Sequence, residues 1–340
     1  MTLFFSGCVA EPQKPILQTV PSGRLDWAGE LPVVHLYGTP YEMGYQQGSL
    51  LRDPARASVE AFLGFGDAAL GIALAGKVFA RRKLDDAWEE MEPSVPQSYL
   101  DEMEGLADGT GLPLQLIHRV HALSELTAVS GAGFAAAGPA TREGRLVHLR
   151  NLDWALPAEV RRYSALIVRH PRKGNTSVTV GWLGFTGAVS GISDQGISVS
   201  ETDTGTMEEE LKGTPMPFLL RAVLDEAKDL EQAVEIVKAA PRTGGYTYLF
   251  ADAKRSKAVL LETTRAECTA AWMGAESTLR LAGEEEVLEG SPKLSPDAAQ
   301  SLVYAYPEMR LGDLQGRGSG EEGSAQVNLK QLFDGAVGGT

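Results

Sequence analysis

Hydrophobic and polar positions change their spacing along this chain, and the changes divide it into regions. A strand-like run, LPVVHLYGTP, begins at residue 31, and from about residue 40 to 127 apolar residues recur mostly at helical spacing. Gly44 and Gly48 lie four apart, on one face of the first predicted helix. Two glycines on one face weaken a helix but allow close contact with another backbone, so we expect a tight packing partner here.

Strand-like patterns begin at about residue 130. GPATREG is the predicted hairpin turn between adjacent strands over 130–136 and 145–151, and several short strand-like runs follow, separated by turn residues. Two helical segments occupy residues 217–240, and two or three further strands extend to about residue 273. This order predicts an α+β fold in which helices pack on antiparallel sheets.

The two ends of the chain differ from its middle in composition. We expect one integrated domain with four parts, namely a signal remnant or tether over 1–28, a helical part over 29–129, a core over 130–275 and a polar, glycine-rich tail over 276–340. Short helices are expected in the tail near Pro296–Ala305 and Gln326–Phe333.

Composition narrows the classes of partner. The 340 residues are 43% hydrophobic and carry a net charge of −14, which is typical of a globular protein with an acidic, solvated surface. Lys and Arg are scattered and form no stripe that could follow a phosphate backbone, so nucleic acid is excluded as the expected partner. No apolar run reaches the 18 residues that a membrane-spanning helix needs.

The two cysteines, Cys8 and Cys268, are too few for a disulfide framework, and neither lies in a metal-binding or redox motif. Cys8 follows LFFSG, a short apolar run ending in small residues, which is typical of a bacterial lipoprotein signal, although its positive and fully apolar regions are missing. We therefore expect an exported protein tethered to a membrane through lipidated Cys8. The alternative is a chance match in a cytoplasmic protein.

Three segments, GTPYEMGYQQG, DEMEGLADGTGL and FAAAGPATREGRLVHLRNLDW, together resemble the isopenicillin-N acyltransferase-like (acyl-CoA:6-aminopenicillanic acid acyltransferase) family. This is a family of cysteine-type N-terminal nucleophile hydrolases, related more distantly to bile-salt hydrolases and acid ceramidases. The resemblance extends from about residue 31 to about residue 265. It implies an αββα sandwich of two stacked antiparallel sheets with helices on both outer faces, and no cofactor.

In this family the precursor cuts its own chain just before a Cys, which becomes the nucleophile while its α-amine serves as general base. An α-amine has a pKa near 8, so a useful fraction is unprotonated at neutral pH, and its place on the same residue as the thiol supplies proximity. The Arg and Asp of Arg-Asn-Leu-Asp flank this Cys and correspond here to Arg150 and Asp153. Asp can accept from the α-amine, and Arg can lower the pKa of the thiol.

The position of the nucleophile holds Gly131, three residues before Phe134, and glycine has no side chain that could attack a carbonyl. Two oxyanion positions differ as well, because Ser193 in GISDQG and Thr247 stand where the family has Asn. The loss of one oxyanion donor costs on the order of a hundred- to a thousand-fold in rate. We therefore predict a degenerate, non-catalytic binding or scaffold protein, with a small N-acyl or amide compound as a possible ligand.

Ser130 offers the alternative. A one-residue bulge would bring its hydroxyl to the place of the thiol and give an active amidohydrolase or acyltransferase on a small N-acyl substrate. Against this, the segment from Phe134 to Asp153 needs no shift, and a one-residue slip turns every side chain of a strand to the opposite face.

Other polar residues have plain structural interpretations. His118 and His121 lie three apart on a helix but have no third metal ligand, so a role on the helix face is favoured and no metal is expected. His148 is predicted to pack or cap. Glu201 and Asp203 could act as acid and base, although carboxylates in loops are common.

Arg150 and Asp153 are expected to point into one cleft, within hydrogen-bond reach of each other or of the backbone near Gly131–Gly133. A buried Arg without a partner costs several kcal/mol, so the pair must be satisfied. Residues three apart in a regular strand face opposite sides, so the strand is expected to end or bend around Asn151.

Overall fold

The computed structural model describes residues 23–71, 76–127, 129–141, 143–203, 211–273 and 302–305, with the backbone alone at 129–130, 203 and 302–305. The helices are α1 (Pro40–Leu50), α2 (Arg52–Leu70), α3 (Gly76–Met91), the 3-10 turn Glu92–Ser94, α4 (Gln97–Thr110), α5 (Leu114–Leu126), α6 (Ala158–Arg161), α7 (Met216–Glu226) and α8 (Leu230–Ala239). The strands are β1 (Arg24–Ala28), β2 (Leu31–Gly38), β3 (Val129–Gly138), β4 (Gly144–Trp154), β5 (Ser164–Pro171), β6 (Ser177–Trp182), β7 (Ser190–Ser193), β8 (Ile197–Asp203), β9 (Tyr246–Asp252), β10 (Lys257–Thr263), β11 (Cys268–Trp272) and β12 (Leu302–Ala305).

Helix α1 begins at a capping box. The Thr39 hydroxyl accepts a hydrogen bond from the amide of Glu42 at 3.3 Å, and the Glu42 carboxylate accepts one from the amide of Thr39 at 2.7 Å. These bonds satisfy two backbone donors that a helix start leaves free. Pro40 occupies the first helical position, where its missing N–H costs nothing.

The tight packing expected at Gly44 and Gly48 is confirmed, and the partner is α4. A Cβ atom on Gly44 would lie 1.8 Å from the carbonyl oxygen of Glu102, and one on Gly105 would lie 2.0 Å from the carbonyl oxygen of Tyr41. No side chain fits at these positions, so the two helix backbones touch. This contact fixes α4 with the Glu102 side chain fully buried.

A nine-stranded sheet forms the centre of the fold, in the order β1-β2-β5-β6-β7-β8-β9-β10-β11. Its neighbours are antiparallel except β2 and β5, which run parallel with Val33 opposite Leu166. Strand β2 belongs to the predicted helical part, and its pairing with β5 connects that part to the core sheet.

A second sheet has the order β12-β3-β4. Strands β3 and β4 are the predicted adjacent pair and form an antiparallel hairpin around the predicted turn. At its other edge β3 pairs with β12, so Leu302–Ala305 is a strand where the sequence predicted the end of a short helix. The partner strand decides this, because extended residues at an open sheet edge gain ladder hydrogen bonds that a local pattern does not reveal.

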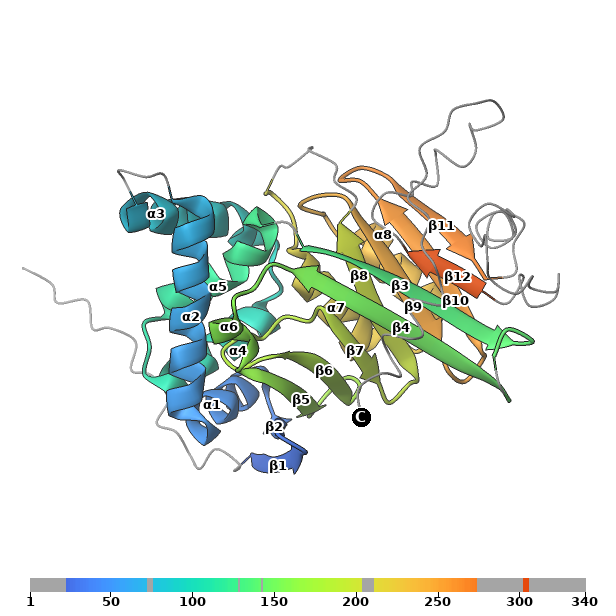
Figure 1. The fold of residues 1–340 in the computed structure, drawn as a ribbon, viewed down its shortest axis with the longest axis horizontal. Coiled ribbons are helices and arrows are strands. Elements are labelled where there is room, and N and C mark those ends of the chain that lie inside the picture. Colours follow the sequence, from blue (N-terminus) through green and yellow to red (C-terminus); the bar gives the residue numbers. More distant parts are fainter. Residues whose placement is uncertain are drawn as a thin grey trace, which may run out of the picture.

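The sheets and helices form layers (Figure 1). On one face of the nine-stranded sheet, α7 and α8 pack against β8, β9 and β10 through an apolar cluster. On the other face lies the smaller sheet, where Ala135 and Ala137 of β3 contact a surface that includes Leu249, Ala251 and Leu260. The α+β class with two stacked sheets is confirmed, and α7 with α8 supplies one of the expected helical layers.

Helices α2 to α5 pack together at one end of the sandwich, at the left of Figure 1. Their core continues into the sheets through Trp154 and Trp182, which meet Phe62 of α2. Among the described residues no helix is both long and apolar enough to cross a lipid bilayer.

Candidate functional site

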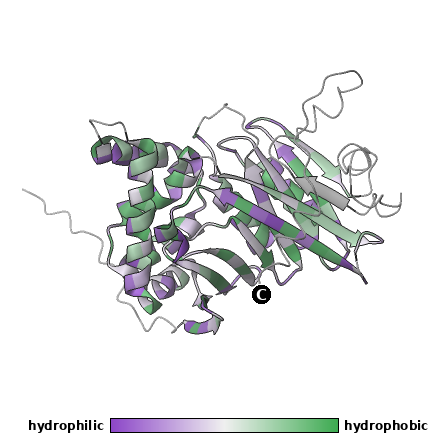
Figure 2. Ribbon diagram, viewed as in Figure 1, coloured by the Kyte–Doolittle hydropathy of each residue, from purple (hydrophilic) through white to green (hydrophobic). Residues whose placement is uncertain are grey.

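A groove with a cavity volume of about 570 Å³ runs between β4 and the open part of the large sheet, and we call it the β4 groove. One wall is the inner face of β4, which presents Leu146, His148, Arg150 and Leu152. These positions alternate along the strand, as expected for side chains on one face, and Figure 2 shows the mixture of polar and apolar residues along β4.

The floor of the β4 groove is apolar. It is formed chiefly by Val178 and Val180 of β6 and Ile192 of β7. Val180 is 50% exposed and Ile192 is 45% exposed, since the small sheet lies mainly against β8 and β9. An apolar floor beside a polar wall is typical of a site for a small amphipathic ligand.

Arg150 is held by Glu201 of β8. Its Nε and Nη2 atoms donate to the carbonyl oxygen of Glu201 at 3.1 and 3.0 Å, and Nη2 also bonds the Glu201 carboxylate. Its Nη1 donates to the hydroxyl of Ser190 at 3.2 Å. Burial lowers the pKa of Arg150, and the charge of Glu201 opposes that effect, so the two side chains form a buried ion pair whose charges balance.

His148 lies next to Arg150 on the same wall and bridges two serines. Its Nδ1 is 2.7 Å from the Ser198 hydroxyl, and its Nε2 is 2.9 Å from the Ser200 hydroxyl. Burial, followed by the positive charge of Arg150, lowers the pKa of His148 to about 4. The imidazole is therefore neutral at pH 7, with one ring nitrogen able to accept a proton.

The expected pairing of Arg150 with Asp153 is wrong. Strand β4 continues past Asn151 to Trp154, with Ala132 opposite Asn151 and no irregularity there. Residues three apart in this regular strand face opposite sides, so the Arg150 side chain is only 7% exposed while Asp153 is exposed. The Asp153 carboxylate accepts from the Asn151 amide at 3.0 Å.

Gly131 lies within the paired part of β3, opposite Leu152. Its carbonyl oxygen accepts a hydrogen bond from Thr202 of β8 at 3.0 Å. A Cβ atom on Gly131 would lie 2.1 Å from the carbonyl oxygen of Asn151. In this conformation the position has no room for any side chain.

The two predicted oxyanion positions lie apart. Thr247 of β9 is buried and stands opposite Thr202, the residue that bonds Gly131. Ser193 is at the far end of β7 from Ser190, three residues away, or about 10 Å along a strand. The structure therefore brings Thr247 near Gly131 and leaves Ser193 outside the lining of the β4 groove.

Several predictions fall outside the described residues. These are the Cys8 tether, the predicted helix over Gln326–Phe333 and the side chains of Ser130 and Asp203. Glu201, predicted as half of a carboxylate pair, instead binds Arg150.

The predicted structural role of His121 agrees with its surroundings. Its Nδ1 lies 2.8 Å from the Ile117 carbonyl, its Nε2 accepts from the Thr186 amide at 2.9 Å, and its ring stacks on Phe185. His118 stacks on Trp88, away from the His121 ring nitrogens. In the described part of the chain no group of three or more His, Cys, Asp or Glu side chains is placed to hold a metal ion.

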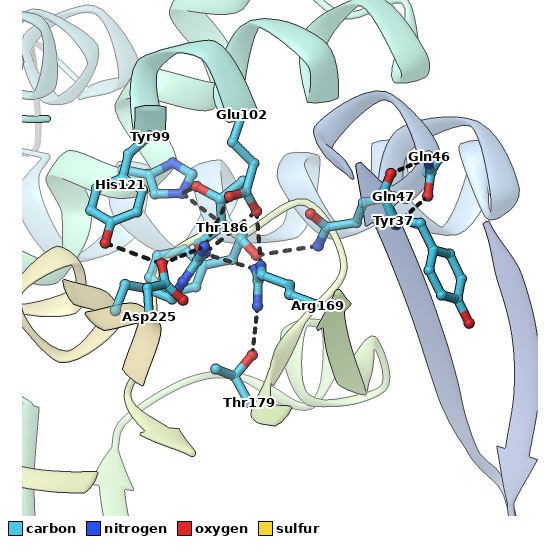
Figure 3. A network of polar contacts seen from close by, with 12 residues as sticks. Tyr37, Gln46, Gln47, Tyr99, Glu102, His121, Arg169, Thr179, Thr186 and Asp225 are labelled. Carbon is cyan, nitrogen blue, oxygen red and sulfur yellow. Dashed lines mark hydrogen bonds and ion pairs between the residues drawn. The ribbon is translucent and has the colours of Figure 1, made fainter. Parts of the chain in front are cut away.

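A larger polar cluster, absent from the sequence predictions, lies at the junction of α4, β5 and α7 (Figure 3). The Glu102 carboxylate accepts from Arg169 Nε at 2.9 Å and from Arg221 Nη2 at 3.0 Å. Arg169 also donates to the Thr179 hydroxyl at 2.9 Å, and Arg221 to Asp225 at 3.2 Å. We call these five residues the Glu102 network. Its three central side chains are almost completely buried, so it is a structural feature of the interior.

The sequence held weak signals for the residues that were missed. Ser198 and Ser200 alternate in the run GISVSE, which places both hydroxyls on one face of a strand. His148 stands two residues before Arg150 and so shares its face. Glu102 interrupts the apolar face of a predicted helix, which is unusual for a carboxylate without a buried partner.

Comparison with known proteins agrees with the sequence resemblance. Residues 140–278 match the family model of acyl-coenzyme A:6-aminopenicillanic acid acyl-transferase. This match confirms the resemblance predicted from the sequence. The matched segment contains the whole wall of the β4 groove, whereas Gly131 precedes it.

Protein dcd1B of Dictyostelium discoideum is 29% identical over 257 residues, which are 68% of this chain and 51% of that protein. The N-acylethanolamine-hydrolyzing acid amidase of Rattus norvegicus is 25% identical over 187 residues, 52% of this chain and 50% of that protein. The chain therefore spans about half the length of these curated relatives. The solved Caenorhabditis elegans N-acylethanolamine-hydrolyzing acid amidase (NAAA) ortholog superimposes with a TM-score of 0.40 at 16% identity, over 55% of this chain and 74% of that one.

Proposed function

We propose that this chain binds a small N-acyl compound in the β4 groove and has no N-terminal nucleophile. The single observation that carries the proposal is Gly131, because it provides no nucleophilic group and a Cβ atom there would lie 2.1 Å from the Asn151 carbonyl oxygen. Arg150, which the family resemblance assigns to the nucleophile, is bound instead to Glu201. Both features support a scaffold that has lost the self-processing chemistry of its family.

The chemistry of the β4 groove supports the ligand class. Val178, Val180 and Ile192 offer an apolar floor for an acyl chain, and the polar wall at His148 and Ser198 offers hydrogen bonds to an amide group. A volume of about 570 Å³ lies within the usual range for small-molecule sites. One relative is named for hydrolysing N-acylethanolamines, so a fluorescent N-acylethanolamine is the first ligand to test.

Intact-mass spectrometry of the purified chain tests the missing nucleophile. We expect one species whose sequence is uninterrupted across residues 129–131, because self-cleavage needs a nucleophile at the new N-terminus. Two fragments that meet at a free α-amine on Ser130 would contradict the proposal and support the active, Ser130-dependent amidohydrolase instead.

Fluorescence titration with the N-acylethanolamine tests the groove. Val180→Glu places a charge on the apolar floor and is expected to weaken binding at least ~10-fold, since a bound acyl chain would take this charge out of water without giving it a partner. Val78→Glu on α3 is the matched control, because Val78 is 80% exposed and lies outside the groove. Equal affinity of both variants, or no binding by the wild-type protein, would sink the ligand assignment.

A further inference from the structure

A hydrogen-bonded row of three side chains joins β4 to β8 at the wall of the β4 groove. Its residue types are those of a catalytic group as well as of a binding site. Ser198 and Ser200 alternate on the face of β8 that is turned toward β4, so both hydroxyls meet the imidazole of His148. The two contacts, at 2.7 Å to Nδ1 and 2.9 Å to Nε2, use both ring nitrogens.

Each of the two serine hydroxyls has a backbone carbonyl as a second partner. The Ser200 hydroxyl is 3.5 Å from the carbonyl oxygen of Leu249 and the Ser198 hydroxyl is 3.4 Å from that of Ala251, so these contacts allow the ring proton of His148 on either nitrogen. With the ring proton on Nε2, His148 donates to Ser200, and Nδ1 is left to accept the hydroxyl proton of Ser198. This is the arrangement of a nucleophile, a base and a group that orients the base.

The two serines differ in access. Ser200 is 2% exposed, whereas Ser198 is half-buried, and both border the β4 groove beside His148. A reagent in the groove can therefore reach the Ser198 hydroxyl, while Ser200 lies deeper between the sheets.

His121 shows what a purely structural histidine looks like in the same molecule. It is equally neutral, but its ring nitrogens meet the Ile117 carbonyl and the Thr186 amide, and its ring is stacked between Phe185 and Phe218. His148 instead meets a serine hydroxyl at the wall of a cavity. The difference lies in the partners and in the open space, since both histidines have a pKa of about 4.

We propose that Ser198 is a nucleophile for activated acyl esters, with His148 as its general base and Ser200 as a positioning residue. Ser198 Oγ attacks the acyl carbon, its proton passes to His148 Nδ1, and the carbonyl electron pair moves to oxygen. The tetrahedral intermediate collapses, the alkoxide leaves with the proton from His148, and acyl-Ser198 remains. Water then attacks this ester, gives a proton to His148, and Ser198 leaves with that proton.

The surroundings restrict the substrate class. The guanidinium of Arg150 next to His148 adds positive potential to this part of the groove, and the Glu201 carboxylate offsets much of it. A base as weak as His148 assists poor leaving groups little, so the site suits activated esters rather than amides. This activity uses none of the residues that the family resemblance assigned to catalysis except Arg150, and it extends the proposed ligand binding in the same groove.

A fluorophosphonate probe tests the proposal directly, because Ser198 Oγ would displace fluoride from its phosphorus. We expect one adduct, located at Ser198 by peptide mass mapping, and none in Ser198→Ala. His148→Gln is expected to label at least ~100-fold more slowly, since a general base contributes that much or more. Ser177→Ala is the matched control and should label at the wild-type rate, because Ser177 is a buried serine on β6 outside the groove.

A folded wild-type protein that gives no adduct, or an adduct at another residue, overturns the proposal. His148→Gln is compared with wild type by thermal melting, and if it does not fold, the Ser198→Ala result and the site of the adduct still decide. N-acylethanolamine titration of Ser198→Ala separates the two proposals. If Ser198→Ala binds the N-acylethanolamine but forms no adduct, both proposals are supported. If the wild-type protein forms the adduct at Ser198 but does not bind the N-acylethanolamine, only the ligand assignment is contradicted.

Discussion

Two buried groups of opposite charges in this molecule have different surroundings, although each joins elements far apart in sequence. In the Glu102 network, the paired side chains of Glu102, Arg169 and Arg221 are only 1–2% exposed, and helices and sheet close around them. The pair of Arg150 and Glu201 is also buried, but Arg150 borders the β4 groove. The Glu102 network organises the interior, and the pair of Arg150 and Glu201 lies beside a space that a ligand can enter.

The number of opposite charges around the central residue also differs between the Glu102 network and the pair of Arg150 and Glu201. Burial by itself raises the pKa of Glu102, but Arg221 and Arg169 outweigh it, so the net pKa is below its usual value. Burial lowers the pKa of Arg150, and one carboxylate, Glu201, is its closest opposite charge. A buried Arg is therefore no sign of a functional site by itself; the neighbouring cavity makes the difference.

The largest effect is expected when the Glu102 network loses its carboxylate. Glu102→Met leaves two guanidinium groups buried without their common partner, and we expect the free energy of unfolding to fall by ~3–5 kcal/mol. Urea denaturation of the full chain measures this. Replacing Glu102, Arg169 and Arg221 together by Met should recover much of the loss, and an unchanged single variant would show that the network does not stabilise the fold.

A smaller loss is expected from the helix contact that places Glu102. Gly105→Ala puts a Cβ atom 2.0 Å from the Tyr41 carbonyl oxygen, so α1 and α4 must separate, at ~1–3 kcal/mol. Gly64→Ala in α2 is the matched control, because Gly64 is exposed with nothing within 4 Å of a new Cβ. The free energy of unfolding of Gly64→Ala should rise by ~0.5–1 kcal/mol. Equal changes in the two variants would contradict a backbone contact between α1 and α4.

The smallest expected effect, that of Asp153→Asn, belongs to a comparison at the groove wall. Arg150→Met leaves the Glu201 carboxylate without its guanidinium, and we expect a loss of ~1–3 kcal/mol, since water in the groove can reach part of the site. Asp153→Asn should change stability by no more than ~0.5 kcal/mol, because Asp153 is exposed and bonds only its neighbour Asn151 in the described structure. A similar loss in both variants would revive the predicted pairing of Arg150 with Asp153.

The sequence by itself determined the local features of the fold. The capping box at Thr39 and the turn between β3 and β4 each depend on residues within a few positions of one another, and the spacing of Gly44 and Gly48 marks the helix face that packs closely. It also showed the family resemblance and the glycine at position 131. These features follow from backbone preferences and side-chain spacing, which a linear pattern carries directly.

Only the tertiary structure decided which polar side chains meet. Arg150 binds Glu201, 51 positions away, and Glu102 binds Arg221, 119 positions away. The family resemblance suggested Asp153 as a neighbour of Arg150 in one cleft, but the regular pleat of β4 turns the two to opposite faces. His148 meets Ser198 and Ser200 only through the stacking of the two sheets, so the sequence pattern did not predict this contact. Burial requires each polar group to find a partner, and the stacking of the two sheets chooses which one is within reach.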